Sequence, residues 1–228
     1  MNTGTGPGAI TPDGSPVEFY LLLDADDEAE VIASAVPAGA SLLELGSGVG
    51  RVTHALLAKG LSVVAVDESA EMLAHVRGAE TVQARVQELD LGRRFDGVVL
   101  ASFLLNTPDD DLRRAFLAAC ARHVAPGGSV LVQWQPYETH ERWAPGMGRT
   151  TGPIGIVMDR VERVEPRLFS ATMRYTHGER AWTQSFESRQ FTDEELAAEL
   201  GTAGLVLDRF LTEDRSWLRA VPAVPAGQ

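Results

Sequence analysis

The 228-residue sequence has few of the residues on which several classes of protein depend. It contains one cysteine, Cys120, which excludes an internal disulfide framework and stands in an Ala- and Leu-rich helical pattern typical of the core. Lys59 is its only lysine, and its arginines are scattered or paired rather than massed. Because binding to phosphate backbones needs a concentrated basic surface, we expect no nucleic-acid partner.

Other absences concern membranes and metals. No apolar run is long enough to span a bilayer, and the N-terminus lacks the basic start and apolar run of a signal peptide. No spacing of His, Cys and carboxylate residues resembles a metal site. We therefore expect no membrane partner, a cytoplasmic location and no metal. The Lys-poor, Ala- and Arg-rich composition is typical of a GC-rich bacterial genome.

The N-terminal part of the chain contains two segments of different composition. Residues 1–16 are rich in Gly, Thr and Pro, carry little to bury, and are predicted to form a flexible tail. Residues 17–36 are apolar and acidic at helical spacing, which predicts a helix that covers the site as a lid. Since no linker follows, residues 17–228 are expected to form a single domain.

The middle of the chain alternates short apolar runs with helical stretches. The runs are apolar on both faces, as strands of a covered parallel sheet should be. Strands are predicted at residues 41–45, 62–67, 81–86, 95–101 and 129–135, and helices at 51–59, 70–77 and 108–124. Thr107 is expected to cap the last of these helices. This alternation indicates right-handed crossovers and a doubly wound α/β sheet.

The pattern changes after Gln135. A loop is predicted to about residue 154, and three strand-like stretches then indicate an antiparallel insertion over about residues 150–190. Thr192 and Glu195 form a capping box that opens a helix, and two final strands are expected after Gly204.

The strongest local signal is the run LLELGSGVGR at residues 42–51, in which a strand leads into a glycine-rich loop that opens a helix. Glycines there permit a tight turn and let a ligand approach the main chain closely. Asp67, 17 residues beyond Gly50, ends the next strand. A carboxylate in that place can accept both ribose hydroxyls of an adenosine.

Two nucleoside ligands suit this arrangement to different degrees. A dinucleotide fingerprint requires its third glycine one position later, where this chain has Arg51. Glu44, just before the loop, would repel phosphates and suits a ligand with an ammonium group. S-adenosylmethionine (SAM) has an amino acid end, a ribose and no phosphate, so the pattern favours SAM over a nicotinamide dinucleotide.

Four runs in order resemble class I SAM-dependent methyltransferases of the small-molecule type. They are ELGSGVG at residues 44–50, VDESAEML at 66–73, FDGVV at 95–99 and APGGSVLV at 125–132. The resemblance implies a Rossmann-like sheet of seven strands, the last one antiparallel, with the antiparallel insertion after the fifth strand. It also implies SAM as cofactor and S-adenosylhomocysteine as product, and it leaves the acceptor unspecified.

The resemblance further implies a set of cofactor-binding residues. Glu44 would face the ammonium, Asp67 would hold the ribose, and Ser102 with Phe103 would lie under the sulfonium. Arg85 is a departure, because family members often carry there an Asp that accepts the adenine amino group; Gln87 or Glu88 is the expected substitute. The predicted cofactor set is Glu44, Gly46, Ser47, Gly48, Asp67, Glu68, Met72, Val86, Gln87, Ser102 and Phe103.

The acceptor is expected beyond the carboxyl ends of the strands, where aromatic side chains can build a partly dry wall. The residues predicted to bind it are Tyr20, Asn106, Trp134 and Trp143. A hydroxyl or protonated amine acceptor would use a general base. His140 is the first candidate because imidazole titrates near neutrality, followed by Tyr137 and Glu138.

The sequence thus predicts a methyltransferase that modifies a nitrogen or oxygen atom of a small molecule, in secondary metabolism. The insertion resembles those of amino-sugar and glycine N-methyltransferases, which favours an amine acceptor and leaves room for a homodimer through the insertion. A non-catalytic SAM- or adenosine-binding partner module is the second hypothesis, and a nicotinamide oxidoreductase is the third.

Overall fold

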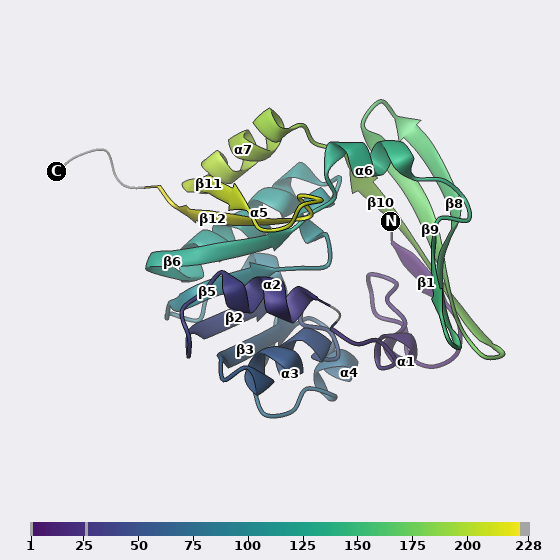
Figure 1. The fold of residues 1–228 in the computed structure, drawn as a ribbon, viewed down its shortest axis with the longest axis horizontal. Helices are drawn as coiled ribbons and strands as arrows, with labels where there is room; N and C mark the ends of the chain where they lie inside the picture. The colour runs from purple at the N-terminus through teal and green to yellow at the C-terminus, as the bar shows by residue number, and fades with distance from the viewer. Residues whose placement is uncertain (1, 26, 224–228) are drawn as a thin grey trace. The chain divides into compact units, whose positions relative to one another are not determined.

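A computed structural model describes residues 2–25 and 27–223 and separates the chain into two compact units (Figure 1). Unit 1 consists of residues 1–24 and 137–190, and unit 2 of residues 25–136 and 191–228. The sequence predicts one domain with an insertion. In the structure that insertion belongs to unit 1 together with the N-terminal segment, and the single domain stays a prediction.

Unit 2 is built on a seven-stranded sheet in the order β11-β12-β6-β5-β2-β3-β4. Strands β2 to β6 pair in parallel, whereas β12 runs antiparallel to β6. This confirms the predicted doubly wound sheet with its antiparallel last strand. The strands are β2 Ser41–Leu45, β3 Ser62–Asp67, β4 Glu80–Gln83, β5 Phe95–Leu100, β6 Val124–Gln133, β11 Leu205–Phe210 and β12 Trp217–Pro222.

Helices pack on both faces of this sheet because its strands are apolar on both sides. Leu43 and Leu45 point to the face of α5 and α7, and Leu42 points to the face of α2 and α3. The helices of unit 2 are α2 Glu28–Ser34, α3 Arg51–Ala58, α4 Ala70–Leu73, α5 Asp110–His123 and α7 Asp193–Thr202, with short 3-10 helices η1 Val86–Glu88 and η2 Leu104–Asn106.

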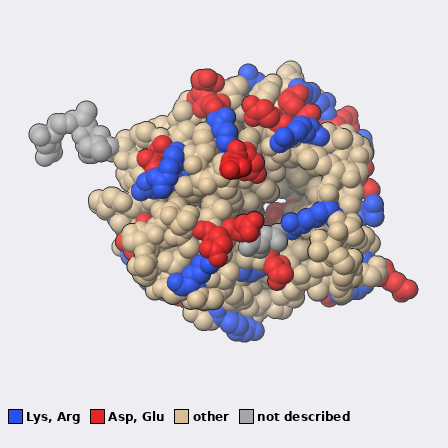
Figure 2. Space-filling model, in the orientation of Figure 1, with Lys and Arg blue, Asp and Glu red and all other residues tan. Residues whose placement is uncertain are grey.

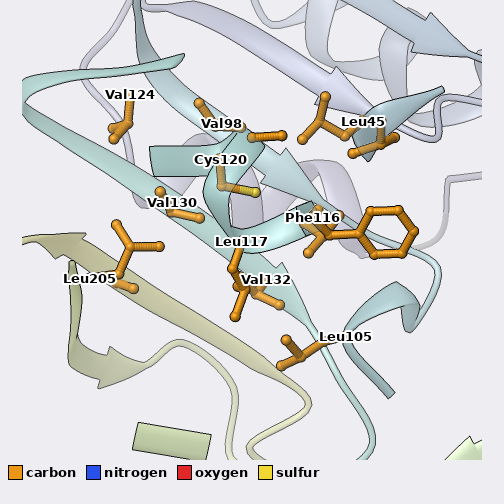
Figure 3. Close-up of a cluster of buried hydrophobic side chains, with 14 of the residues drawn as sticks. Leu45, Val98, Leu105, Phe116, Leu117, Cys120, Val124, Val130, Val132 and Leu205 are labelled. Carbon is orange, nitrogen blue, oxygen red and sulfur yellow. The ribbon is translucent and has the colours of Figure 1, made fainter. Parts of the chain in front are cut away.

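The larger core cluster lies between the sheet and α5 (Figure 3). Phe116, Leu117 and Cys120 of α5 pack there against Val98 and Val130 of the sheet. Cys120 is fully buried, and burial raises the pKa of its thiol to about 12. A thiol that stays protonated inside an apolar cluster is a core residue, as the sequence predicts.

Unit 1 is built on a five-stranded antiparallel sheet in the order β1-β10-β9-β8-β7. The predicted insertion is confirmed and extended by two strands that the sequence did not indicate, β1 and β7. The elements of unit 1 are β1 Thr3–Thr5, α1 Val17–Tyr20, α6 Tyr137–Arg142, β7 Gly148–Thr151, β8 Ile154–Glu165, β9 Leu168–His177 and β10 Arg180–Arg189.

The N-terminal segment differs from its prediction as a flexible tail. Over the described residues 2–16, β1 pairs with β10, and the indole N–H of Trp182 donates to the Pro7 carbonyl at 2.8 Å. A Cβ atom on Gly4 would lie 2.0 Å from the Gly14 carbonyl oxygen, so only glycine permits this approach. The glycine content that indicated disorder therefore serves close backbone packing.

Several predicted helix limits also need correction. The lid helix predicted over residues 17–36 is two helices, α1 in unit 1 and α2 in unit 2. Aspartates stand between them, and Asp favours turns and helix ends over helix interiors. Helix α5 is capped by Asp109, which accepts from two backbone N–H groups of the first turn, rather than by Thr107. Helix α6 forms inside the predicted loop.

The exposed arginines are scattered over the surface, as their spacing in the sequence predicts. On the face drawn in Figure 2, basic side chains lie among acidic ones rather than in a patch of their own. Within residues 2–25 and 27–223, no helix is long and apolar enough to cross a membrane. The same described residues contain no group of three His, Cys, Asp or Glu side chains arranged to hold a metal.

Candidate cofactor site

The glycine loop follows β2 at the carboxyl edge of the parallel sheet. Gly46, Gly48 and Gly50 have φ angles of 74°, 56° and 83°, a left-handed conformation that glycine adopts without strain. The backbone N–H groups of Gly46 and Ser47 both donate to the Val66 carbonyl at 2.9 Å. The loop is therefore fixed against the end of β3, where the predicted ribose acid follows.

Asp67 is joined directly to this loop. Its Oδ2 accepts the Gly48 N–H at 2.8 Å, and its Oδ1 accepts the Ser69 N–H at 2.9 Å. Met72 lies over the same loop, since a Cβ atom on Gly48 would be 3.9 Å from its sulfur. The structure thus brings together the glycine bend, the carboxylate and the predicted adenine neighbour Met72 on one edge.

Ser47 gives an independent sign that this loop is built for a ligand. Its hydroxyl oxygen is buried and has no hydrogen-bond partner among the residues that the structure describes. A buried unpaired polar group costs about 1–3 kcal/mol, so such atoms are rare without a functional reason. A polar ligand on the glycine loop would supply the missing partner.

Glu44 lies at the inner end of the same site. Its side chain is 2% exposed, and the Thr53 hydroxyl donates to its Oε2 at 2.6 Å. Burial raises the pKa of this carboxyl to about 7, although the Thr53 hydrogen bond and the Arg51 charge favour ionisation. A cation beside this carboxyl would stabilise its ionised form. The ammonium group of an amino acid is such a cation.

A chain of polar contacts leads from Arg51, at the start of α3, to the end of β5. Arg51 forms an ion pair with Glu28 of α2, and the Gln133 amide donates to Glu28 at 3.2 Å. The Gln133 oxygen in turn accepts the Ser102 N–H at 2.9 Å. Side chains thus connect helices α2 and α3 with the end of β6 and the turn after β5.

The turn at Ser102 and Phe103 has an unusual backbone. Both residues have φ of 57°, a left-handed conformation that is uncommon outside glycine and an outlier for a bulky residue. A Cβ atom on Gly46 would lie 3.2 Å from Leu104, so this turn packs beside the glycine loop. Strained turns of this kind concentrate at functional sites.

The predicted adenine side is less well defined. Arg85 ion-pairs with Glu68 at 3.4 Å and with Glu88 at 3.5 Å, so the residue that departs from the family pattern is neutralised locally. Val86 is buried in η1, and Gln87 is half-buried beside it. The roles of Glu68, Val86 and Gln87 stay predictions.

Two residues predicted to bind the acceptor are buried and hydrogen-bonded to the backbone. Both amide atoms of Asn106 are hydrogen-bonded to the backbone of Gln135, at 2.7 and 3.2 Å. Trp134 is fully buried in the core, and its indole N–H donates to the Arg215 carbonyl at 2.7 Å. Asn106 is 2% exposed and Trp134 is 0% exposed, so both also serve packing, and their roles toward the acceptor stay predictions.

His140, the first predicted general base, is buried among aromatic side chains. Its side chain is 0% exposed, and its Nε2 is 2.8 Å from the Ser188 hydroxyl. Its ring lies 4.5 Å from that of Trp143 and 5.2 Å from that of Phe169, measured between centroids. These contacts give the imidazole a packing role in unit 1, and its role as a base stays a prediction.

The remaining predicted residues of unit 1 are more accessible. Tyr137 is half-buried and Glu138 is exposed on α6, and Trp143 is half-buried after the same helix. The half-buried Tyr20 donates from its hydroxyl to Gln184 at 3.5 Å. Their proposed roles toward base or acceptor stay predictions.

Sequence reasoning missed four polar residues of the site, namely Glu28, Arg51, Thr53 and Gln133. Two left a signal. Thr53 is a polar residue on the apolar face of α3, and Gln133 directly follows the apolar run at residues 130–132 of β6. For Glu28 and Arg51 the sequence gives no signal, because their pairing depends on how α2 meets α3.

Three features together define the class of protein, which binds a nucleoside with an amino acid end. They are the seven-stranded sheet with an antiparallel last strand, the glycine loop hydrogen-bonded to a carboxylate at a strand end, and the buried acid beside that loop. Comparisons with known proteins agree. Residues 42–128 match the family model of a methyltransferase domain. Over 168 residues the chain is 33% identical to an uncharacterized methyltransferase of Mycobacterium tuberculosis, covering 71% of this chain and 67% of that protein.

Two relatives have more specific descriptions. A dTDP-3-amino-3,4,6-trideoxy-alpha-D-glucopyranose N,N-dimethyltransferase of Streptomyces venezuelae is 28% identical over 141 residues, 55% of this chain and 58% of that protein. The solved structure of CalS10, an amino pentose methyltransferase from Micromonospora echinaspora, is 26% identical with a TM-score of 0.66, covering 85% and 88% of the two chains. The chain belongs to the SAM-dependent methyltransferases, and SAM is its cofactor.

Proposed function

We propose that the protein transfers the methyl group of SAM to a nitrogen or oxygen atom of a small-molecule acceptor in secondary metabolism, and that an amine is the first acceptor to test. The observation that carries the proposal is the 2.8 Å hydrogen bond between the Gly48 N–H and Asp67. It makes one continuous site of the two features that would hold opposite ends of the cofactor. The amino-sugar relatives support the choice of an amine.

The residues of the site divide the work of holding the cofactor. Asp67 would accept the ribose hydroxyls, Glu44 would pair with the ammonium, and Ser47 would donate or accept at the amino acid end. SAM supplies a methyl group that is already activated by a sulfonium. The protein therefore contributes mainly orientation and exclusion of water, and good orientation is worth about 7–11 kcal/mol.

Methylation of the acceptor also requires that a proton be removed from it. A protonated amine must lose a proton before its lone pair can attack, and a positioned base contributes about 10²- to 10⁴-fold. His140, Tyr137 and Glu138 are the candidates that we propose for this base, and the burial of His140 makes Tyr137 and Glu138 the first to test. A cytoplasmic location and a homodimer through the five-stranded sheet accompany the proposal, and light scattering on the purified protein tests the dimer.

The decisive experiment has two stages. Calorimetric titration with SAM, S-adenosylhomocysteine and NADH tests the donor, and NADH binding without SAM binding would favour an oxidoreductase. Transfer of a labelled methyl group is then measured on matched acceptor pairs, such as a nucleotide-activated amino sugar and its hydroxyl counterpart. Methyl uptake by the amine alone supports the proposal. SAM binding with no uptake across the panel would point to a non-catalytic partner module.

A further inference from the structure

We infer that Gln133 is a positioning residue that connects the two ends of the cofactor site. It is the last residue of β6 and is buried, and the three residues before it in the strand are apolar. Its side chain bridges the Ser102 N–H at 2.9 Å and the Glu28 carboxylate at 3.2 Å. This inference rests on the proposed function, in which the Ser102–Phe103 turn faces the reacting end of the cofactor.

The chemistry of the two contacts requires an amide at this position. One partner is an N–H donor, so Gln133 must present an oxygen to it. The other partner is a carboxylate, so Gln133 must present an N–H to it. A primary amide satisfies both demands at once, and this also fixes which amide atom is oxygen and which is nitrogen. Neither Leu nor Glu can do both.

The turn on one side of Gln133 needs support. Ser102 and Phe103 hold left-handed backbone conformations in succession, and such strain persists only where the surroundings impose it. Phe103 is 39% exposed, so its own packing is incomplete. The Gln133 oxygen is therefore a principal restraint on the turn beside Gly46.

The acid on the other side of Gln133 leads to the ammonium end. Glu28 pairs with Arg51, and the Arg51 charge acts on Glu44. Gln133 thus lies in one relay of contacts from Ser102 through Gln133 and Glu28 to Arg51, and the Arg51 charge favours the ionised form of Glu44. All five residues belong to unit 2, so the relay is complete within one compact body. It restrains the turn and the charges at the edge of β2 together.

Binding measurements test the relay without an acceptor. We expect Gln133→Leu to weaken SAM binding about tenfold, as for a lost hydrogen bond to a charged network, and to leave adenosine binding unchanged. Hydrogen exchange at the Ser102 amide should accelerate in the same variant. Gln133→Glu should keep the Ser102 amide protected, since a carboxylate still accepts, yet weaken SAM binding through repulsion of Glu28.

A double-mutant cycle and a matched control complete the experiment. Gln133→Leu and Glu28→Leu should not add, because each breaks the same relay. Glu30→Leu, an exposed change on the same helix, should leave SAM affinity unchanged. Unaltered SAM affinity in Gln133→Leu, or an equal loss of adenosine affinity, would overturn the inference. Failure of methyl uptake alone would overturn the proposed function and leave these binding results standing.

Discussion

Asp67 shows how one side chain can serve both the free protein and the ligand. In the free protein its two oxygens accept N–H groups from the glycine loop and from Ser69. Each carboxylate oxygen can accept more than one hydrogen bond, so ribose hydroxyls can be added to these contacts. The same residue therefore shapes the loop and reads the sugar.

We expect Asp67→Ala to weaken SAM binding by about 1–3 kcal/mol, because hydrogen bonds to a charged group are lost. Asp67→Asn should lose less, since an amide oxygen can still accept one N–H. Calorimetry gives both affinities, and circular dichroism checks that the variants are folded. A folded Asp67→Ala variant with the affinity of the wild type would remove Asp67 from the ribose assignment.

Glu44 makes the affinity for SAM depend on pH. Its pKa of about 7 means that the free protein holds a proton there at pH 6. If the ionised carboxylate pairs with the ligand ammonium, binding must release that proton. Affinity should rise with pH by up to about tenfold per unit below pH 7 and level off above it.

Calorimetry in two buffers of different ionisation heat measures the released proton directly. Glu44→Gln should abolish both the release and the pH dependence. The raised pKa also implies a sign for stability, since the unfolded carboxyl ionises near pH 4.5. The free protein should lose up to about 3 kcal/mol of stability as pH rises from 4.5 to 7. A pH-independent affinity in the wild type would contradict the ammonium assignment.

At the scale of elements, α6 shows how a short helix can be held by a few hydrogen bonds beside an aromatic cluster. His140 lies between Trp143 and Phe169, and Ser188 of β10 meets its Nε2. Gln190 donates to the Tyr137 carbonyl and to Glu141, which attaches the same helix to the chain after β10. The helix is therefore attached to unit 1 along its length.

We expect His140→Ala to destabilise the protein by about 2–5 kcal/mol, because it opens a cavity among aromatic rings. Arg142→Ala, an exposed change on the same helix, should stay within about 0.5 kcal/mol. Urea denaturation followed by tryptophan fluorescence measures both. A general base would behave differently, with unchanged stability and a large loss of turnover, and that result would restore His140 to the mechanism.

At the scale of the whole molecule, cofactor binding and folding are linked. A ligand that binds only the folded protein at 100 times its dissociation constant stabilises it by about 2.7 kcal/mol. For a chain of this size we therefore expect SAM to raise the melting temperature by about 5–10 °C. NADH at the same concentration should produce no shift. Equal shifts with both ligands would show that the site reads only the shared adenosine.

The sequence by itself determined the elements whose signals are local. Strands β2 and β3, the glycine loop and the Asp67 position follow from apolar runs and turn chemistry, and the structure keeps their limits. The capping box at Thr192 is another such signal, and both of its hydrogen bonds are present. These features depend on neighbours within a few residues, so periodicity and side-chain chemistry suffice to predict them.

Only the tertiary structure decided which polar residues share a site and which are enclosed. Gln133 meets Glu28 across 105 residues of chain, and His140 meets Ser188 across 48. The N-terminal glycines pack against β10 instead of remaining free, and Trp134 and Asn106 turn to backbone partners. Such contacts depend on how helices and strands pack against one another. That packing is driven by the burial of whole apolar faces, so a local sequence pattern cannot predict the contacts.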